Sequence, residues 1–217
     1  MVLLAYSLVV VLSYLLGSVP SGFLAGKMRG IDIRKAGSGN IGATNVFRIL
    51  GKWAGTGVLM MDALKGWLAV TVVAELVALG FGPPTMTPEA APSLHGLQLA
   101  AGLAAILGHN YTCWLKFKGG KGIATSSGVL IAWLPLPFLV MLGVWLVVFA
   151  LSRYVSLASL ATALALPFAT WWLDGRSSMI LITTLLSAMA IYKHRANITR
   201  LLNGTVNRFG KKQEAAK

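Results

Sequence analysis

The chain of 217 residues contains few of the residues that soluble proteins use at their surfaces and in their cross-links. Only 12% of its residues are charged, whereas about a quarter are charged in an ordinary soluble domain. A single cysteine, Cys113, excludes an internal disulfide and a metal site made of several cysteines. Cysteine in an apolar stretch behaves as a small hydrophobic residue, so we assign Cys113 no role.

Hydrophobic residues take the place of the missing charges. They make up 56% of the chain, and the mean hydropathy is +0.73. Because they form long blocks without charge, the blocks must satisfy their backbone hydrogen bonds internally, as helices in a membrane. We therefore predict an all-α integral membrane protein with a single polytopic domain, residues 1–209, and a polar C-terminal tail, residues 210–217.

The net charge of +13 is unbalanced, with 19 Lys and Arg against 6 Asp and Glu. In a membrane chain this excess is typical of loops held in the cytoplasm, so we expect no nucleic-acid partner. Residues 1–26 carry no charge and so lack the basic start of a cleavable signal peptide. We expect them to remain as the first transmembrane helix, with the N-terminus outside.

The basic segments predict the sides of the later helices. Residues 27–52 and the C-terminal region are basic and expected inside, whereas residues 82–92 contain no Lys or Arg and are expected outside. The uncharged block 122–152 keeps the C-terminus cytoplasmic only if it crosses twice, as two short helices broken around Pro135 and Pro137. About seven transmembrane helices are therefore predicted, near residues 1–26, 53–80, 94–115, 123–134, 136–151, 155–173 and 177–192.

The first cytoplasmic loop combines glycines with small polar side chains over residues 37–45. Its glycines match the dinucleotide-binding spacing G-x-G-x-x-G, but hydrophobic spans flank the loop where that fold needs a strand and a βαβ unit. Glycine allows successive N–H groups to converge on an anion, and Ser, Asn and Thr add donors. We interpret this loop as a phosphate cradle.

The second cytoplasmic loop, residues 116–122, has the same character and leads into Thr125. It is not a Walker A motif, because Leu115 replaces the first Gly and Gly122 the Ser or Thr. Glycine amides, lysine charge and a helix N-terminus together favour an anion. The alternative is that lysines are common wherever a chain turns at the inner face of the membrane. That would explain the lysines, but not why two loops combine glycines with clustered Ser, Asn and Thr.

Asp62, Lys65 and His109 are ionisable residues that lie in or beside the hydrophobic segments. Asp62 and Lys65, three positions apart, share a helix face, and we interpret them as a structural ion pair. For His109, both a catalytic and a structural role stay open.

One motif is missing. Soluble-type and peripheral glycerolipid acyltransferases use a His-x-x-x-x-Asp dyad, whereas Trp114 stands five residues after His109, and His95 and His194 have no such partner either. Acyl phosphate would offer a route without the dyad, because phosphate is a good leaving group. The enzyme would then hold two anions and stabilise an oxyanion.

Several motifs resemble, in order and spacing, those of the PlsY-type acyl-phosphate:glycerol-3-phosphate acyltransferases. The resemblance extends from about Tyr14 to Phe209. It implies a seven-helix enzyme of the bacterial cytoplasmic membrane, with its active site on the cytoplasmic side. The matching runs are residues 37–45, 108–109, 117–125, 153–159 and 192–198.

The reaction that this resemblance implies moves an acyl group from acyl phosphate to the 1-hydroxyl of glycerol 3-phosphate, giving lysophosphatidic acid and phosphate. This is the first step of bacterial phospholipid synthesis. No metal, other cofactor, acyl-CoA or acyl carrier protein is implied, and membrane lipids are the surroundings. In the family the acyl phosphate's own phosphate is thought to assist deprotonation of the hydroxyl, which fits the missing dyad.

Site residues are carried over motif by motif. The resemblance implies catalytic roles for Ser38, His109, Lys121 and Asn197. Those implied in substrate binding are Gly37, Gly39, Asn40, Gly42, Thr44, Asn45, Arg48, Lys116, Gly119, Gly120, Gly122, Thr125, Ser156, His194 and Arg195.

The alternative of a different class is a small transporter or channel for phosphate or phosphorylated solutes, with the same loops as an anion vestibule. A through-path would place charge on both faces, and the expected outer segments have almost none. A purely structural scaffold explains the loops least well. The sequence leaves open the acyl-chain preference, the oligomeric state and the group that moves the proton.

Overall fold

The computed structural model describes residues 1–81, 92–206 and 208–209. These residues form helices and turns, with no β-strand among them, so the predicted all-α fold is confirmed. Each of the seven predicted hydrophobic segments contains a helix. Most of the expected external loop, residues 82–91, and the expected tail, residues 210–217, lie outside the described residues.

The chain divides into two compact units, the first ending at Trp133 and the second beginning at Leu134. The division falls at the proline break predicted from Pro135. The single domain expected from the sequence stays a prediction.

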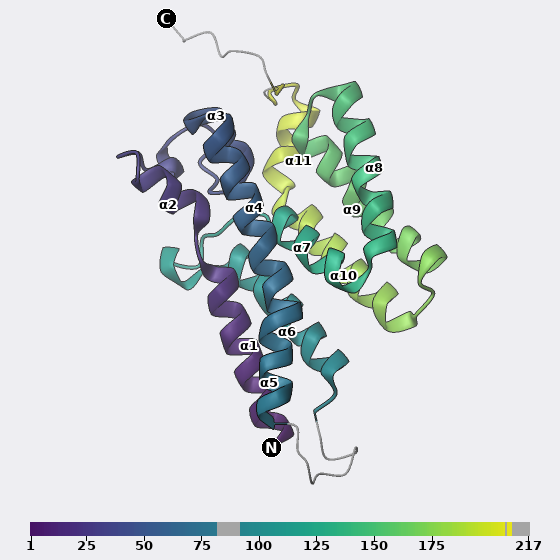
Figure 1. Ribbon diagram of the computed structural model, residues 1–217. Helices are drawn as coiled ribbons and strands as arrows, with labels where there is room; N and C mark the ends of the chain where they lie inside the picture. The colour runs from purple at the N-terminus through teal and green to yellow at the C-terminus, as the bar shows by residue number, and fades with distance from the viewer. Residues whose placement is uncertain (82–91, 207, 210–217) are drawn as a thin grey trace, which may run out of the picture. The chain divides into compact units, whose positions relative to one another are not determined.

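In the first unit, α1 packs along α6, and α4 packs along α7 (Figure 1). A core of Ala, Val and Leu side chains lies between α1, α5 and α6. The helices of this unit are α1 Val2–Ser18, α2 Ser21–Lys27, α3 Ala43–Leu50, α4 Lys52–Leu68, α5 Ala74–Phe81, α6 Leu94–Asn110 and α7 Ile123–Trp133. Three shorter elements are the 3₁₀ turns η1 Ile33–Lys35 and η3 Cys113–Leu115, and the π-helical turn η2 Ala69–Val73, which joins α4 to α5.

The first hydrophobic segment is interrupted, which corrects the single helix expected over residues 1–26. Helix α1 ends at Ser18 and α2 begins at Ser21. Pro20 explains the break, because proline lacks an N–H group and disfavours helical backbone in the residue before it. The interruption leaves the carbonyl groups of Ser18 and Val19 without helical donors, and the Val19 carbonyl accepts from the Ser21 N–H at 3.0 Å instead.

Close helix packing in the first unit depends on glycine. A Cβ atom at Gly128 of α7 would lie 1.8 Å from the carbonyl oxygen of Ala63 in α4. One at Gly108 of α6 would lie 2.2 Å from the carbonyl oxygen of Tyr14 in α1. Small residues allow helix backbones to approach closely, which is a common way of packing helices in membranes.

Two helix lengths differ from expectation. Helix α6 ends at Asn110, five residues before the predicted end, and a turn containing η3 follows. Of the two helices around the proline break, α7 is short, with 11 residues or about 17 Å. Its partner α8, Pro135–Ser152, has 18 residues and is therefore not short.

In the second unit, α9 packs against both α8 and α10. The helices after α8 are α9 Val155–Leu173, α10 Ser177–Lys193 and α11 Arg195–Leu202. The chain after α11 returns to the α8–α9 corner, where the Phe209 N–H donates to the carbonyl of Arg153 at 2.9 Å. The Phe209 ring also meets Phe149 edge-on, with 5.6 Å between centroids.

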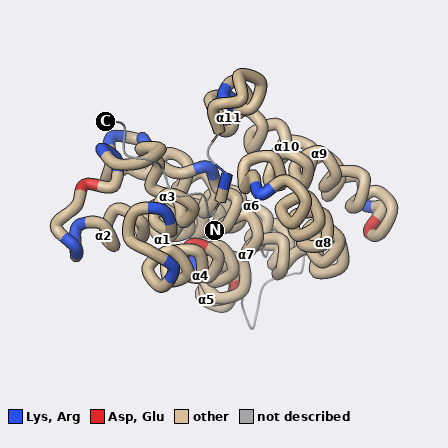
Figure 2. The backbone as a smooth tube through the Cα atoms, turned by 90° about the horizontal axis from the view of Figure 1, so that it is seen from above, with Lys and Arg blue, Asp and Glu red and all other residues tan. Residues whose placement is uncertain are grey.

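Within the described residues, four helical segments are long and apolar enough to cross a membrane: 2–27, 52–81, 135–152 and 155–173. Two further apolar helices, α7 and α10, are shorter. In the first unit, Met1 and the chain ends that flank residues 82–91 lie at one end, and α3 lies at the other (Figure 1). Basic positions gather around α2, α3 and the start of α4 (Figure 2).

Candidate functional site

The first glycine-containing loop is folded around the side chain of Asn45. This side chain is 2% exposed, and its Oδ1 accepts from the Ser38 N–H at 2.8 Å. Its Nδ2 donates to the carbonyls of Ile33 and Ala36, at 3.1 and 3.0 Å. The Asn45 amide group thus holds the loop backbone in place, while Ser38 is exposed. The expected role of Asn45 in substrate binding stays a prediction.

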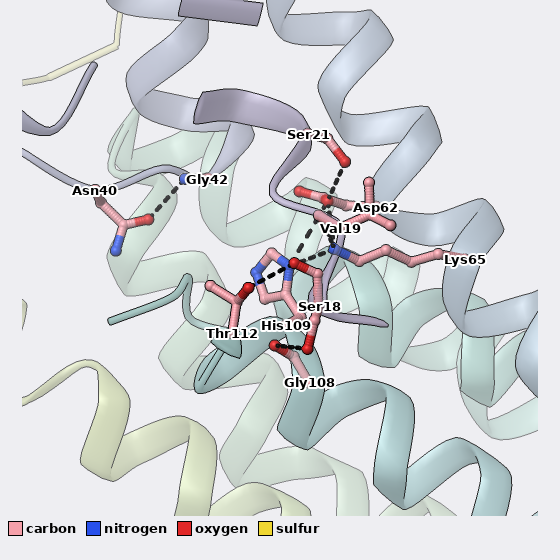
Figure 3. Close-up of polar contacts among 10 residues, drawn as sticks. All are labelled: Ser18, Val19, Ser21, Asn40, Gly42, Asp62, Lys65, Gly108, His109 and Thr112. Carbon is pink, nitrogen blue, oxygen red and sulfur yellow. Dashed lines mark hydrogen bonds and ion pairs between the residues drawn. The ribbon is translucent and has the colours of Figure 1, made fainter. Parts of the chain in front are cut away.

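Two other features shape the same loop. Gly37 and Gly39 have φ values of +59° and +71°, in the left-handed region that favours glycine. Asn40 Oδ1 accepts from the Gly42 N–H at 2.8 Å (Figure 3). This turn directs the chain into α3, so Thr44 and Arg48 lie on a helix rather than in the loop expected from the sequence.

An ion pair stands at the entrance to this loop. Arg34 donates to both carboxylate oxygens of Asp32, at 2.9 and 2.8 Å. These charged hydrogen bonds lower the pKa of Asp32 to about 2. Asp32 also accepts from the Arg34 N–H and so caps η1.

The two glycine-containing loops lie over one hydrophobic cluster. Ile33, Ile41 and Val46 come from the first loop region, Val58 from α4 and Leu115 from the second loop region. All five are buried, and they pack together as one core. The structure therefore brings the two predicted loops to the same end of the first unit.

The second loop is clamped onto the C-terminus of α6. The Gly119 N–H donates to the carbonyl of Asn110 at 3.2 Å, and the Gly120 N–H donates to that of His109 at 2.9 Å. A Cβ atom at Gly119 would lie 2.0 Å from the His109 carbonyl oxygen. These two glycines therefore provide close packing, and their amides donate to backbone carbonyls. The phosphate binding expected of this loop stays a prediction.

The rest of the second loop leads into the N-terminus of α7. Lys116 and Phe117 have left-handed backbone, with φ of 53° and 58°, and Gly122 has φ of 83°. Lys121 is half-buried just before the helix. Thr125 is fully buried in the first turn of α7, and its Oγ1 has no hydrogen-bond partner within the part of the chain described.

A cluster of buried polar residues lies beside this loop (Figure 3). Lys65 Nζ is 2.9 Å from Asp62 Oδ1, so the ion pair predicted from sequence is confirmed. The same Nζ is 2.9 Å from His109 Nδ1, and it donates to the Val19 carbonyl at 3.0 Å. Ser21 Oγ donates to Asp62 Oδ1 at 3.0 Å. The ion pair is therefore part of a larger network, which was not predicted from the sequence.

This network satisfies the break in the first hydrophobic segment. Lys65 Nζ donates to the Val19 carbonyl, and Thr112 Oγ1 donates to the Ser18 carbonyl at 2.6 Å. Both carbonyls lack a helical partner because of Pro20. Pro20 next to Ser21, between two apolar stretches, was the sequence signal for such a site.

The other predicted site residues belong to the second unit. Ser156 is buried in the first turn of α9, and within the described residues its Oγ has no hydrogen-bond partner. His194 is buried between α10 and α11, and its Nδ1 lies 2.8 Å from the Ala190 carbonyl oxygen. Arg195 stacks on Tyr192, at 4.4 Å from guanidinium to ring centroid. Asn197 is half-buried in α11.

No group of three or more His, Cys, Asp or Glu side chains that could hold a metal ion occurs among the described residues. The chemistry that the first unit offers is anion binding and hydrogen bonding. Its elements are the half-buried ammonium of Lys121, the N-terminus of α7 and the hydroxyls of Ser38 and Thr125.

Comparison with known proteins identifies the family. Residues 7–204 match the family described as glycerol-3-phosphate acyltransferase. A protein of that name from Geotalea daltonii is 44% identical over 197 residues, which are 91% of this chain and 94% of that protein. One from Desulforudis audaxviator is 46% identical over 209 residues, covering 95% and 96% of the two chains.

A solved structure has the same fold. The crystal structure of PlsY (YgiH), described as an integral membrane glycerol 3-phosphate acyltransferase in its glycerol 3-phosphate form, has a TM-score of 0.80 and 38% identity. The alignment covers 94% of this chain and 96% of that one. The chain is therefore an all-helical, multi-pass integral membrane protein that belongs to the glycerol-3-phosphate acyltransferase family.

Proposed function

We propose that this protein transfers an acyl group from acyl phosphate to the 1-hydroxyl of glycerol 3-phosphate. The products are lysophosphatidic acid and inorganic phosphate. The observation that carries the proposal is the convergence of the two glycine-containing loops over one buried cluster, in a chain whose fold matches this acyltransferase. Crystal structures of PlsY in a glycerol 3-phosphate form and a lysophosphatidic acid form support the acceptor and the product.

The choice of acyl phosphate as donor rests on the chemistry of the site. The chain lacks the His-x-x-x-x-Asp dyad that would deprotonate the hydroxyl. The buried His109 is also committed to Lys65, through contact between Nδ1 and Nζ. A donor with a phosphate leaving group reduces the need for a protein base, because the leaving group departs as a stable anion.

We assign the charge-stabilising role to Lys121. It precedes the N-terminus of α7, where helix dipole and ammonium charge both favour a phosphate or a developing oxyanion. Thr125 and Ser38 would donate hydrogen bonds, and Arg48 would bind phosphate. The roles of Ser156, His194, Arg195 and Asn197 stay predictions from the sequence motifs.

The active site would face the cytoplasm of a bacterial cell. The first unit supports this sidedness, because the basic segments around α2 and α3 and the exposed Lys116 and Lys118 belong to the predicted inner loops.

In the deciding experiment, the purified protein is incubated with palmitoyl phosphate, with and without glycerol 3-phosphate, and phosphate release and lysophosphatidic acid are measured. A parallel reaction contains palmitoyl-CoA instead of palmitoyl phosphate. We expect phosphate release that depends on glycerol 3-phosphate, with lysophosphatidic acid as product, and no product from palmitoyl-CoA. Product formed from palmitoyl-CoA but not from palmitoyl phosphate would overturn the assignment of acyl phosphate as the donor. Failure of a folded preparation with both donors would overturn the reaction.

A further inference from the structure

Lys65 is matched to three acceptors. An ammonium group carries three protons, and Nζ has three acceptor atoms around it: Asp62 Oδ1 at 2.9 Å, the Val19 carbonyl at 3.0 Å and His109 Nδ1 at 2.9 Å (Figure 3). The side chain is buried, so each proton needs such a partner.

This arrangement assigns the proton of the His109 ring. A proton on Nδ1 would point at an ammonium group 2.9 Å away, donor against donor. Nδ1 therefore accepts, and the ring carries its proton on Nε2. The carboxylate of Asp62 lies farther from Nδ1, at 3.6 Å, and completes its ion pair with Lys65 instead.

The Nε2 edge of the same ring faces the second loop. A Cβ atom added at Gly120 would lie 2.0 Å from His109 Nε2. The Gly120 N–H also donates to the backbone carbonyl of His109. The ring is thus held between Lys65 on one edge and Gly120 on the other, and Lys121 is the next residue in the chain.

We propose that Lys65 is a positioning residue, which orients the His109 ring and through it the Gly119–Lys121 turn that presents the Lys121 ammonium group. The inference rests on the proposed function and adds a residue to it. Lys65 touches no substrate in this proposal. Through its contacts with the Val19 carbonyl and with His109, Lys65 links the α1–α2 break to the loop before α7.

A double-mutant cycle tests this coupling. Lys65→Met removes the donor, and Gly120→Ala forces the ring away from the turn. We expect Lys65→Met alone to lower kcat/KM about 100-fold, the size of effect that misplacement of a reacting group by about 1 Å can produce. In the Gly120→Ala background, Lys65→Met should lower kcat/KM by less than about tenfold, because the contact between the His109 ring and Gly120 is already broken.

Gly57→Ala provides the matched background. Gly57 lies in α4, and a Cβ atom there meets nothing within 4 Å. Lys65→Met should keep its full effect in this background. An equal effect of Lys65→Met in the Gly120→Ala and Gly57→Ala backgrounds would overturn the proposal.

A second measurement needs neither turnover nor a variant of Lys65. Nitrogen NMR of ¹⁵N-histidine-labelled protein in detergent reports which ring nitrogen carries the proton, with His109→Gln used to assign the signal. We expect a protonated Nε2 and a bare Nδ1 at His109. A protonated Nδ1 in the folded protein would overturn the inference, whether or not the protein turns over, so this failure is separate from failure of the proposed reaction.

Discussion

Lys65 in α4 and His109 in α6 lie 44 positions apart in the chain, yet Nζ of the first is 2.9 Å from Nδ1 of the second. This contact joins the two helices directly beside the loop that carries Lys121. In the proposed mechanism, a histidine at a helix end is structural and still matters for catalysis, because it supports the loop that carries Lys121.

Replacement of Lys121 by alanine should abolish most activity. The ammonium group is the positive charge nearest in sequence to the α7 N-terminus, so its loss should lower kcat about 100- to 1000-fold, as for other groups that stabilise an oxyanion. Initial rates with palmitoyl phosphate check this. Lys118 lies in the same loop but is exposed, so Lys118→Ala is the control, and its kcat should stay near that of the unaltered protein. Near-normal kcat/KM in Lys121→Ala would remove the central role of this residue.

Asn45→Asp should disturb the first loop although the two side chains have nearly the same shape. The carboxylate can still accept from the Ser38 N–H, but it repels the carbonyls of Ile33 and Ala36, to which the amide donates. Buried groups without partners cost about 1–3 kcal/mol each. Thermal unfolding in detergent should show a lower midpoint, and KM for glycerol 3-phosphate should rise. An unchanged midpoint and KM would argue against the holding role of Asn45.

Gly128→Ala should destabilise the first unit. Its Cβ atom would lie 1.8 Å from the Ala63 carbonyl oxygen, so α4 and α7 must separate, at a cost of about 1–3 kcal/mol. The unfolding midpoint in detergent measures the effect. The same change at Gly57, where a Cβ atom has open space, should leave the midpoint unchanged or raise it. Equal midpoints for the two variants would contradict the close approach of α4 and α7.

The predicted sidedness can be tested with single cysteines in a Cys113→Ser background. Arg153→Cys should be labelled by a membrane-impermeant maleimide only after the membrane is permeabilised, because the α8–α9 corner is expected inside. Arg176→Cys, in the turn between α9 and α10, should be labelled on intact cells. Labelling of Arg153→Cys from outside would reject the seven-helix count.

Much of the fold could be predicted from local sequence. Charge-free blocks predicted the helical segments, because a backbone in hydrocarbon must bond to itself, and α9 begins and ends at the predicted residues. Prolines marked the break between α7 and α8. The broken first segment was missed, although Pro20 carried the same signal, because hydrophobicity on both sides outweighed it.

The candidate site was predictable only as two loops of suitable composition. Glycines, lysines and small polar residues in loops on the same predicted face indicated anion binding, and the motifs indicated the family. The sequence could not show that Asn45 and the amides of Gly119 and Gly120 are occupied by backbone groups. Hydrogen-bond partners depend on which backbone atoms fold back onto the side chain, and spacing alone does not determine this.

The sequence by itself determined the membrane class, the helical segments, the Asp62–Lys65 pair and the family resemblance, because each depends on composition or on neighbours a few residues apart. Only the tertiary structure decided that Lys65 also meets Val19 and His109, and that Ile33 and Leu115 share one core. These contacts join segments separated by dozens of residues, and they form only when α1, α4 and α6 pack together.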